Sequence, residues 1–277
     1  MINKKFIAIL MLVAMTFGAT ASAPEVSPYH PWKNLKVAYL GDSITDARLS
    51  PSTKKYWQWL AEWLGITPYV YAKSGRQWDD LERQAGLLDK EHGTDFDAIM
   101  IFIGTNDYIH DTAMGEWYTE TAEKTDFALG EPKRAAVLKK RTLNMDQSTF
   151  KGRINNALSM LKSRYPDKQI VVLTPIHRAG FLRSDTNWQP AECYANRLGL
   201  YISDYVDAVK EASAIWSVPV IDTYALSGLY PMDDAYAQYF TDGATDRLHP
   251  NTAGHYRLAL TLLYQLSTLP GRVIQCQ

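Results

Sequence analysis

Apolar runs of four to six residues recur along the chain, and each is followed by a glycine or a polar side chain. Runs of this length predict β-strands. The wholly apolar run at residues 98–103 (AIMIFI) is typical of a central parallel strand that is covered on both faces. The pattern predicts five strands, at residues 35–40, 68–72, 98–103, 169–173 and 218–221.

Between these runs, apolar residues recur at intervals of three and four, which is the spacing of one helix face. Leu81, Ala85 and Leu88 show this spacing in a segment that ends before Gly93. Pro166 ends a second such segment. The pattern predicts five helices, at residues 53–64, 78–92, 150–165, 200–216 and 251–266.

Strands and helices alternate along the chain, which favours an α/β fold with a parallel sheet. We predict a three-layer architecture, an open parallel five-stranded sheet flanked by helices, in a single domain over residues 24–277. Residues 108–148 interrupt the alternation, and segments of this length usually carry function or small structure of their own. Residues 116–118 and 139–143 are predicted to pair as a hairpin, and a solvated surface insertion is the alternative.

Residues 1–23 have the three parts of a secretory signal peptide. They are a positive start at Lys4 and Lys5, an unbroken apolar run at residues 6–15, and a small-x-small cleavage site ending at Ala23. The run is about half as long as a membrane-spanning helix needs to be. We predict export to the periplasm or the extracellular space, and the alternatives are a buried helix or a membrane anchor.

Composition narrows the classes of function. The chain has 29 Lys and Arg against 30 Asp and Glu, and this balance lacks the basic footprint of a nucleic-acid-binding protein. No run after the predicted signal peptide approaches the length of a membrane span, so we expect no stable membrane insertion. Cys193 and Cys276 are too few for a disulfide framework or a four-cysteine zinc site. Export would allow them to pair, although nothing in the sequence shows that they meet.

The residues with candidate chemistry follow the predicted strands, at the edge where open parallel sheets bind ligands. Ser43 follows the first strand, Gly75 the second and Asn106 the third. Asp246 and His249 come after the fifth strand, before the last helix. Together they supply a nucleophile, a base, an orienting carboxylate and oxyanion donors, as acyl transfer requires. No His, Cys and Asp cluster has metal-ligand spacing, so we predict neither a metal nor another cofactor.

Four short blocks in this order resemble those of the SGNH hydrolases, also called GDSL esterases. Residues 41–43 (Gly-Asp-Ser) are similar to the first block, and Gly75 fits the glycine of the second. Residues 104–107 (Gly-Thr-Asn-Asp) are similar to the third block, and Asp246-x-x-His249 to the last. The resemblance spans about residues 35–267, and it implies a flavodoxin-like fold and a carboxylic ester hydrolase. The long insertion departs from the minimal family pattern, which bears on the substrate pocket rather than on the chemistry.

The resemblance implies a role for each of these residues. Ser43 would be the nucleophile, His249 the general base, and Asp246 the carboxylate that orients the histidine. The backbone N–H groups of Ser43 and Gly75 and the side-chain amide of Asn106 would form the oxyanion hole. The structural alternatives are a helix cap at the serine, an Asx turn at the asparagine and a loop cap at the aspartate.

The substrate is less strongly indicated than the chemistry. Trp78, Tyr108, Trp117 and Tyr118 lie on predicted loops at or near the catalytic edge. Exposed aromatic rings are suited to stacking on sugars, although packing is their commoner role. His177 follows the fourth strand, where we expect a structural or substrate-contact role rather than catalysis. We predict an enzyme that removes short acyl groups, acetyl above all, from carbohydrate.

Two other functions remain open. A lipase or lysophospholipase would need an apolar acyl channel and often a lipid-facing segment, and no amphipathic segment of the sequence requires one. A carbohydrate-binding protein on a catalytically dead hydrolase fold is the alternative of another class, and the four intact blocks argue against it. The expected binding partner is a small-molecule or glycan ester. The sequence leaves the acyl group, the alcohol and the oligomeric state open.

Overall fold

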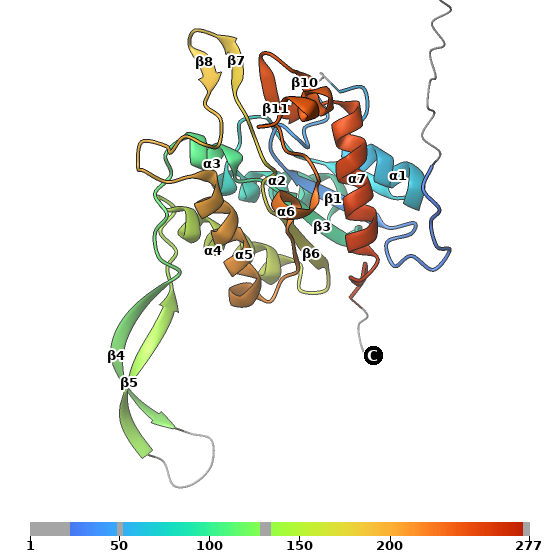
Figure 1. Cartoon of the computed structure of the whole chain (residues 1–277). Helices are drawn as coiled ribbons and strands as arrows, with labels where there is room; N and C mark the ends of the chain where they lie inside the picture. Colours follow the sequence, from blue (N-terminus) through green and yellow to red (C-terminus); the bar gives the residue numbers. More distant parts are fainter. Residues whose placement is uncertain (1–22, 49–51, 128–133, 274–277) are drawn as a thin grey trace, which may run out of the picture.

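The computed structural model describes residues 23–48, 52–127 and 134–273. Its centre is a parallel sheet, and each predicted strand is present with ends within about two residues of the prediction. The predicted five-stranded α/β architecture is therefore confirmed. The strands lie in the order β2 (Thr67–Val70), β1 (Lys36–Gly41), β3 (Ala98–Phe102), β6 (Gln169–Leu173) and β9 (Val220–Ile221) (Figure 1).

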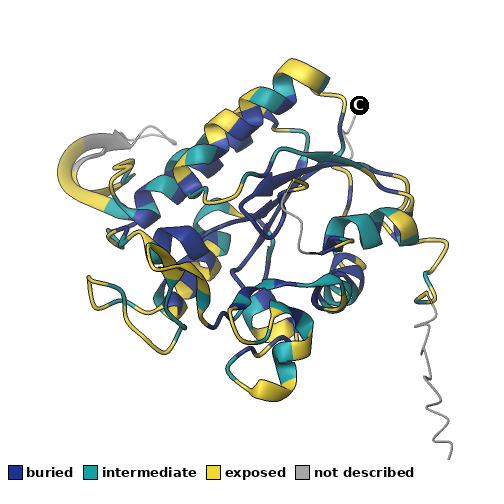
Figure 2. Cartoon of the chain, turned by 90° about the horizontal axis from the view of Figure 1, so that it is seen from above, coloured by how far each residue is buried: buried dark blue, intermediate teal, exposed yellow. Residues whose placement is uncertain are grey.

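Neighbouring side chains along each strand enter two separate apolar clusters, because a strand points successive side chains to opposite faces. On β1, Val37 and Tyr39 enter one cluster and Ala38 and Leu40 the other. Figure 2 shows that the strands at the centre of the parallel sheet are buried and that the helices expose their outer faces. The first cluster is covered by α1 (Tyr56–Leu64) and α7 (Thr252–Leu266), and the second by α2 (Leu81–His92), α4 (Phe150–Arg164) and α5 (Ile202–Trp216).

A second, antiparallel sheet has no counterpart among the predicted elements. It joins segments that are far apart in the sequence, and Asp246 of one strand pairs with Phe181 of another. Because neither segment contains a long apolar run, the pairing becomes visible only in the folded chain. The strand order is β10 (Phe240–Asp242), β11 (Asp246–Pro250), β7 (Phe181–Ser184) and β8 (Asn187–Gln189).

The insertion contains a long two-stranded hairpin, β4 (Tyr118–Phe127) and β5 (Arg134–Leu143), which projects from the rest of the molecule (Figure 1). Tyr118 pairs with Leu143, so the predicted hairpin is confirmed, with longer strands than predicted. The first two residues of the insertion, 108 and 109, belong to the short helix α3 (Thr105–Ile109). The remaining short elements are α6 (Thr223–Leu226) and the 3₁₀ turns η1 (Trp78–Asp80) and η2 (Asp234–Tyr239).

Some predictions fall on residues that the structure does not describe. The predicted signal peptide lies outside the described residues apart from Ala23, and so does Cys276. Cys193 is exposed. Export and the pairing of the two cysteines therefore stay predictions. Within the described ranges, no helix is long and apolar enough to cross a membrane.

Candidate active site

Ser43 lies in the turn that follows β1. Gly41 ends this strand so close to β3 that a Cβ atom there would lie 2.4 Å from the Phe102 carbonyl oxygen, so only glycine fits. The Gln84 side chain accepts a hydrogen bond from the Gly41 N–H at 2.8 Å and donates one to the Gly41 carbonyl at 2.9 Å. The Asp42 carboxylate then accepts a backbone N–H two residues further on, at 3.1 Å. These bonds fix the turn that presents Ser43.

Ser43, His249 and Asp246 form a chain of hydrogen bonds. The Ser43 Oγ lies 3.0 Å from Nε2 of His249. On the other side of the ring, Nδ1 of His249 lies 2.9 Å from Oδ2 of Asp246. A carboxylate only accepts, so the Nδ1–H donates to Asp246 and leaves Nε2 to accept from the serine hydroxyl. The three predicted residues are thus brought together in the order nucleophile, base and carboxylate.

The structure places Asp246 and His249 on strand β11, not on the loop that the sequence indicates. Oδ1 of Asp246 also accepts the backbone N–H of Leu248 at 3.1 Å and that of His249 at 3.0 Å. The Phe181 ring meets the His249 ring edge-on, with centroids 5.4 Å apart. The imidazole is therefore held by a carboxylate at one edge and by an aromatic contact from β7.

The predicted oxyanion donors line the same cavity as Ser43. The Asn106 side-chain amide donates one hydrogen to the Arg76 carbonyl at 3.0 Å, which orients it and leaves its second hydrogen free. Gly75 has φ +76°, a conformation that favours glycine. Within the described residues, the backbone N–H groups of Ser43 and Gly75 have no hydrogen-bond partner. Three candidate oxyanion donors thus line the same cavity as Ser43.

The cavity around Ser43 has a volume of about 680 Å³. Its apolar lining comes from Ile109, Phe181, Leu182, Trp188 and Leu248. Hydroxyl, amide or charged groups lie beside these side chains, from Ser43, Lys55, Ser74, Asn106, His110, Arg183, Thr186, Asn187, Gln189, Thr241, Asp242, Thr245, Asp246 and His249.

Residues 39–257 match the GDSL-like Lipase/Acylhydrolase family. The chain belongs to this family. It is a carboxylic ester hydrolase, as the resemblance predicts. No curated protein matches the chain.

Solved structures of GDSL hydrolases and similar proteins share the fold. A protein from Lactobacillus plantarum has 25% identity and a TM-score of 0.65, with 86% of this chain and 98% of that chain covered. A possible lipase from Chitinophaga pinensis has 19% identity and a TM-score of 0.61, with 85% and 98% covered. An acetyl xylan esterase from Geobacillus stearothermophilus has 21% identity and a TM-score of 0.50, with 88% and 98% covered.

In this GDSL hydrolase, buried charges hold the short helix α3 that carries Asn106. Asp107 is fully buried, pairs with Arg153 at 2.8 Å, and accepts the Trp78 backbone N–H at 3.3 Å. Burial raises the pKa of the Asp107 carboxyl to about 7, and the Arg153 guanidinium limits that rise. The ion pair therefore ties α3 to α4.

Arg178 fixes the other side of α3 and is a residue that no sequence pattern singles out. Its fully buried guanidinium donates to Thr105 Oγ1 at 3.0 Å and to Gln189 Oε1 at 2.7 Å. Burial lowers the pKa of Arg178 to about 10, so it keeps its charge at neutral pH. Arg178 thus joins α3 to strand β8 of the second sheet.

Lys55 and the β7–β8 hairpin are further parts of the hydrolase cavity that the sequence did not predict. Lys55 is buried, lines the cavity, and burial lowers the pKa of its ammonium to about 8. The hairpin places Phe181 and Trp188 on the cavity wall. Asp185 and Thr186 separate its two short strands, and this turn signal could have revealed the hairpin.

The expected substrate contacts of the hydrolase need correction. The prediction of exposed aromatic rings is wrong for Trp78, Tyr108 and Trp117, because these side chains are buried. His177 lies near Glu192, with its Nδ1 2.7 Å from Oε1, and its ring packs against Tyr224. Among the described residues that line the cavity at Ser43, none is Trp78, Tyr108 or His177. The indole and phenol rings pack in the core instead, because residues just after a strand can still be covered by the apolar cluster.

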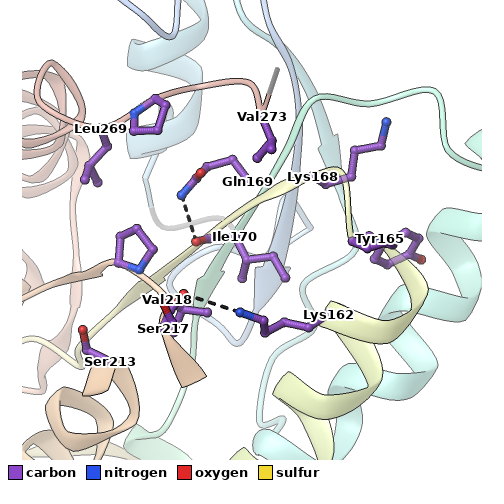
Figure 3. Close-up of a pocket in the computed structure, with 13 residues that line it drawn as sticks. Lys162, Tyr165, Lys168, Gln169, Ile170, Ser213, Ser217, Val218, Leu269 and Val273 are labelled. Atoms are coloured by element: carbon purple, nitrogen blue, oxygen red, sulfur yellow. Dashed lines mark hydrogen bonds between the residues drawn. The ribbon is translucent and has the colours of Figure 1, made fainter. Parts of the chain in front are cut away.

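A second cavity lies at the opposite edge of the sheet, where β6 begins (Figure 3). Its wall includes Lys162, which donates to the Ser217 carbonyl at 3.5 Å, and Gln169, which donates to the Ile170 carbonyl at 3.3 Å. Its described lining contains serines but no histidine, and Lys162 there donates to backbone carbonyl groups. It therefore lacks the hydrogen-bonded serine, histidine and aspartate that make the Ser43 edge the candidate active site.

Proposed function

We propose that this hydrolase is a serine esterase that removes short acyl groups, acetyl above all, from carbohydrate. The observation that carries the proposal is the pair of hydrogen bonds from Ser43 to His249 and from His249 to Asp246, at 3.0 and 2.9 Å. This is the geometry that a nucleophile, a base and an orienting carboxylate need.

In the proposed reaction, His249 takes the Ser43 proton as Oγ attacks the ester carbonyl carbon. The oxyanion accepts hydrogen bonds from the Asn106 amide and from the backbone N–H groups of Ser43 and Gly75. His249 then returns the proton to the leaving alcohol, and an acyl group stays on Ser43. Water attacks this acyl-enzyme with His249 again as base, and the acid leaves. One side-chain oxyanion donor contributes about 100- to 1000-fold in kcat, which is the size of effect assigned to Asn106.

The cavity wall supports a sugar as the alcohol. Hydroxyl groups of a sugar need hydrogen-bond partners, and the amides, hydroxyls and charges around Ser43 supply them. A long acyl chain would leave many of these groups without partners, which costs binding free energy. Solved structures with this fold include a possible lipase and an acetyl xylan esterase, so we base the substrate class on the cavity and not on the fold.

The test compares acetylated glycans with p-nitrophenyl esters of two to twelve carbons, using purified wild type and Ser43→Ala. We expect acetyl release from at least one glycan, a fall in kcat/KM with acyl length, and loss of both activities in Ser43→Ala. An organophosphonate probe should label Ser43 alone. A preference for esters of eight carbons or more, with no glycan deacetylated, would replace this proposal with the lipase alternative. Glycan binding without any turnover in wild type would favour the binding protein.

A further inference from the structure

A second hollow adjoins the catalytic cavity. It has a volume of about 730 Å³ and shares two lining residues, Ile109 and Trp188, with the cavity at Ser43. Because both residues line both spaces, the two hollows are neighbours that meet at Ile109 and Trp188. We call the second hollow the Tyr194 groove, after the aromatic side chain at its far side.

The Tyr194 groove carries the groups that recognise sugars. Trp188 is 60% exposed and Tyr194 63% exposed, so their rings are available for stacking on the apolar face of a sugar. Asp111 and Arg197 also line the groove and form an ion pair at 2.7 Å. Aromatic faces beside hydrogen-bonding side chains suit a sugar, which has apolar ring faces and hydroxyl groups at its edges.

The groove is preformed, because its far side is tied to α3. The Tyr108 hydroxyl donates to the Tyr194 carbonyl, and Asn196 Nδ2 donates to the Tyr108 carbonyl at 3.1 Å. The backbone N–H of Arg197 donates to Asp111 Oδ1 at 2.7 Å. Buried Tyr108 thus anchors the segment that carries the exposed ring. A fixed site loses little conformational entropy when a ligand binds.

The short helix α3 fixes where the groove lies relative to the proposed site of reaction. Asn106, the proposed oxyanion donor, and Ile109, which both hollows share, lie within α3 only three residues apart. A ligand that occupies the groove and continues past Ile109 and Trp188 therefore reaches the space beside Ser43. A single sugar would fill only one of the two hollows.

On the basis of the proposed function, we propose that the Tyr194 groove binds the sugar units next to the acylated one, so that the preferred substrate is an acetylated oligosaccharide or polysaccharide. Stacking on Tyr194 and Trp188 positions the chain, and the ester group enters the cavity at Ser43. This assigns Trp188 of β8 and Tyr194 of the segment between β8 and α5 to substrate binding.

The experiment measures kcat and KM of the full-length mature enzyme on acetylated xylo- and cello-oligosaccharides with one, three and six units, and on p-nitrophenyl acetate. We expect kcat/KM per acetyl group to rise with chain length. Tyr194→Ala should raise KM for the six-unit substrate about three- to tenfold, with kcat and p-nitrophenyl acetate hydrolysis unchanged. Tyr194 is the better target, because Trp188 also lines the catalytic cavity. The matched control is Tyr264→Ala, whose ring is 62% exposed on α7, outside both hollows.

The outcomes separate this proposal from the one on which it rests. Equal kcat/KM for substrates of one and six units would contradict sugar binding in the groove and leave the proposed esterase function unaffected. Equal effects of Tyr194→Ala and Tyr264→Ala would have the same consequence. Hydrolysis of p-nitrophenyl acetate with no acetylated saccharide accepted would contradict both proposals. Sedimentation velocity at the assay concentration tests whether a second copy of the chain occupies the groove instead. A dimer that Tyr194→Ala dissociates would make the groove an interface between two copies and overturn the proposal.

Discussion

Single residues far apart in the sequence meet at the active site, and the distances between them carry mechanistic meaning. Ser43 lies near the start of the chain and His249 near its end, yet their side chains are hydrogen-bonded. Motif spacing predicts both residues, because each stands beside a strand end. Spacing could not predict that Trp78 and Tyr108 are buried, because burial depends on what packs over a ring.

The proposed nucleophile and base should behave as one unit. We expect Ser43→Ala and His249→Ala each to lower kcat about 10⁴- to 10⁶-fold on p-nitrophenyl acetate, and the double variant to cost little more. The reason is that the serine hydroxyl is a weak nucleophile without its base. Steady-state kinetics measure the effect, with circular dichroism to show that each variant is folded. Losses that multiply in the double variant would mean that the two residues act independently.

Asp246→Asn should cost less than His249→Ala, about 10²- to 10⁴-fold in kcat, because a base remains while its tautomer and charge stabilisation suffer. The matched control is Asp222→Asn. Asp222 also follows a strand, but it caps α6 and accepts the Ala225 N–H at 3.1 Å. We expect nearly wild-type kcat for this control. Wild-type kcat/KM in a folded Asp246→Asn variant would show that Asp246 does not orient the histidine.

The buried Asp42 carboxyl should make stability depend on pH. Burial raises the pKa of Asp42 from 3.8 to about 7. Between about pH 4 and pH 7 the folded protein holds a proton that the unfolded chain has released, so the free energy of unfolding falls as pH rises through this window. The Asp42→Asn variant has no such proton. Its free energy of unfolding should therefore fall less over this window than that of wild type, by on the order of a few kcal/mol.

Urea unfolding at about pH 5 and pH 8 tests this difference. Exposed Asp185, changed to Asn, is the control and should leave the pH dependence of wild type unchanged. Other buried groups, such as Asp107, titrate in all three proteins and cancel in the comparison. An Asp42→Asn variant with the full wild-type dependence would show that Asp42 is ionised in the folded protein at low pH.

At the scale of elements, the two hairpins have different relations to the site. The β7–β8 hairpin forms part of the cavity wall and packs Phe181 against His249. The β4–β5 hairpin pairs with itself and projects from the rest of the molecule (Figure 1). Sequence predicted the second hairpin and not the first, because the β7 and β8 strands are short and are completed by pairing with β11.

Replacement of residues 119–142 by Asn-Gly should therefore spare the small-ester activity. Tyr118 and Leu143 are paired directly, so a two-residue turn closes the shortened hairpin. We expect kcat/KM for p-nitrophenyl acetate within about twofold of wild type, and a melting temperature within about 4 °C, because the described side chains removed are almost all exposed. A large loss of activity in a folded variant would give the hairpin a part in the site.

At the scale of the whole molecule, one sheet separates two apolar clusters and presents its carboxyl edge to the substrate. This arrangement places Ser43, Gly75 and Asn106 after three strands that end at one edge, and β11 of the second sheet brings His249 to Ser43. The second sheet and the buried ion pairs then fix their relative positions. The hydrolase is thus assembled from segments that contribute one or two functional groups each.

Export is the prediction that concerns the whole chain and its compartment. We expect the protein to be cleaved after Ala23 and to reach the periplasm or the medium, because residues 1–23 have the charged, apolar and small-residue parts of a signal peptide. N-terminal sequencing of the exported protein should start at Pro24 or within a few residues of it. Replacing both Lys4 and Lys5 by Glu should reduce export. Full-length protein with Met1 in the cytoplasm would contradict the prediction.

The sequence by itself determined the alternation of strands and helices, the family and the candidate residues at the strand ends. These features follow from local periodicity and from short motifs, which are written in neighbouring residues. Only the tertiary structure decided that Asp246 and His249 stand on a strand, that Arg178 bridges α3 and β8, and that the hollow at Tyr194 adjoins the cavity at Ser43. Each of these depends on contacts between distant segments. These contacts form only when the two apolar clusters pack on the two faces of the sheet.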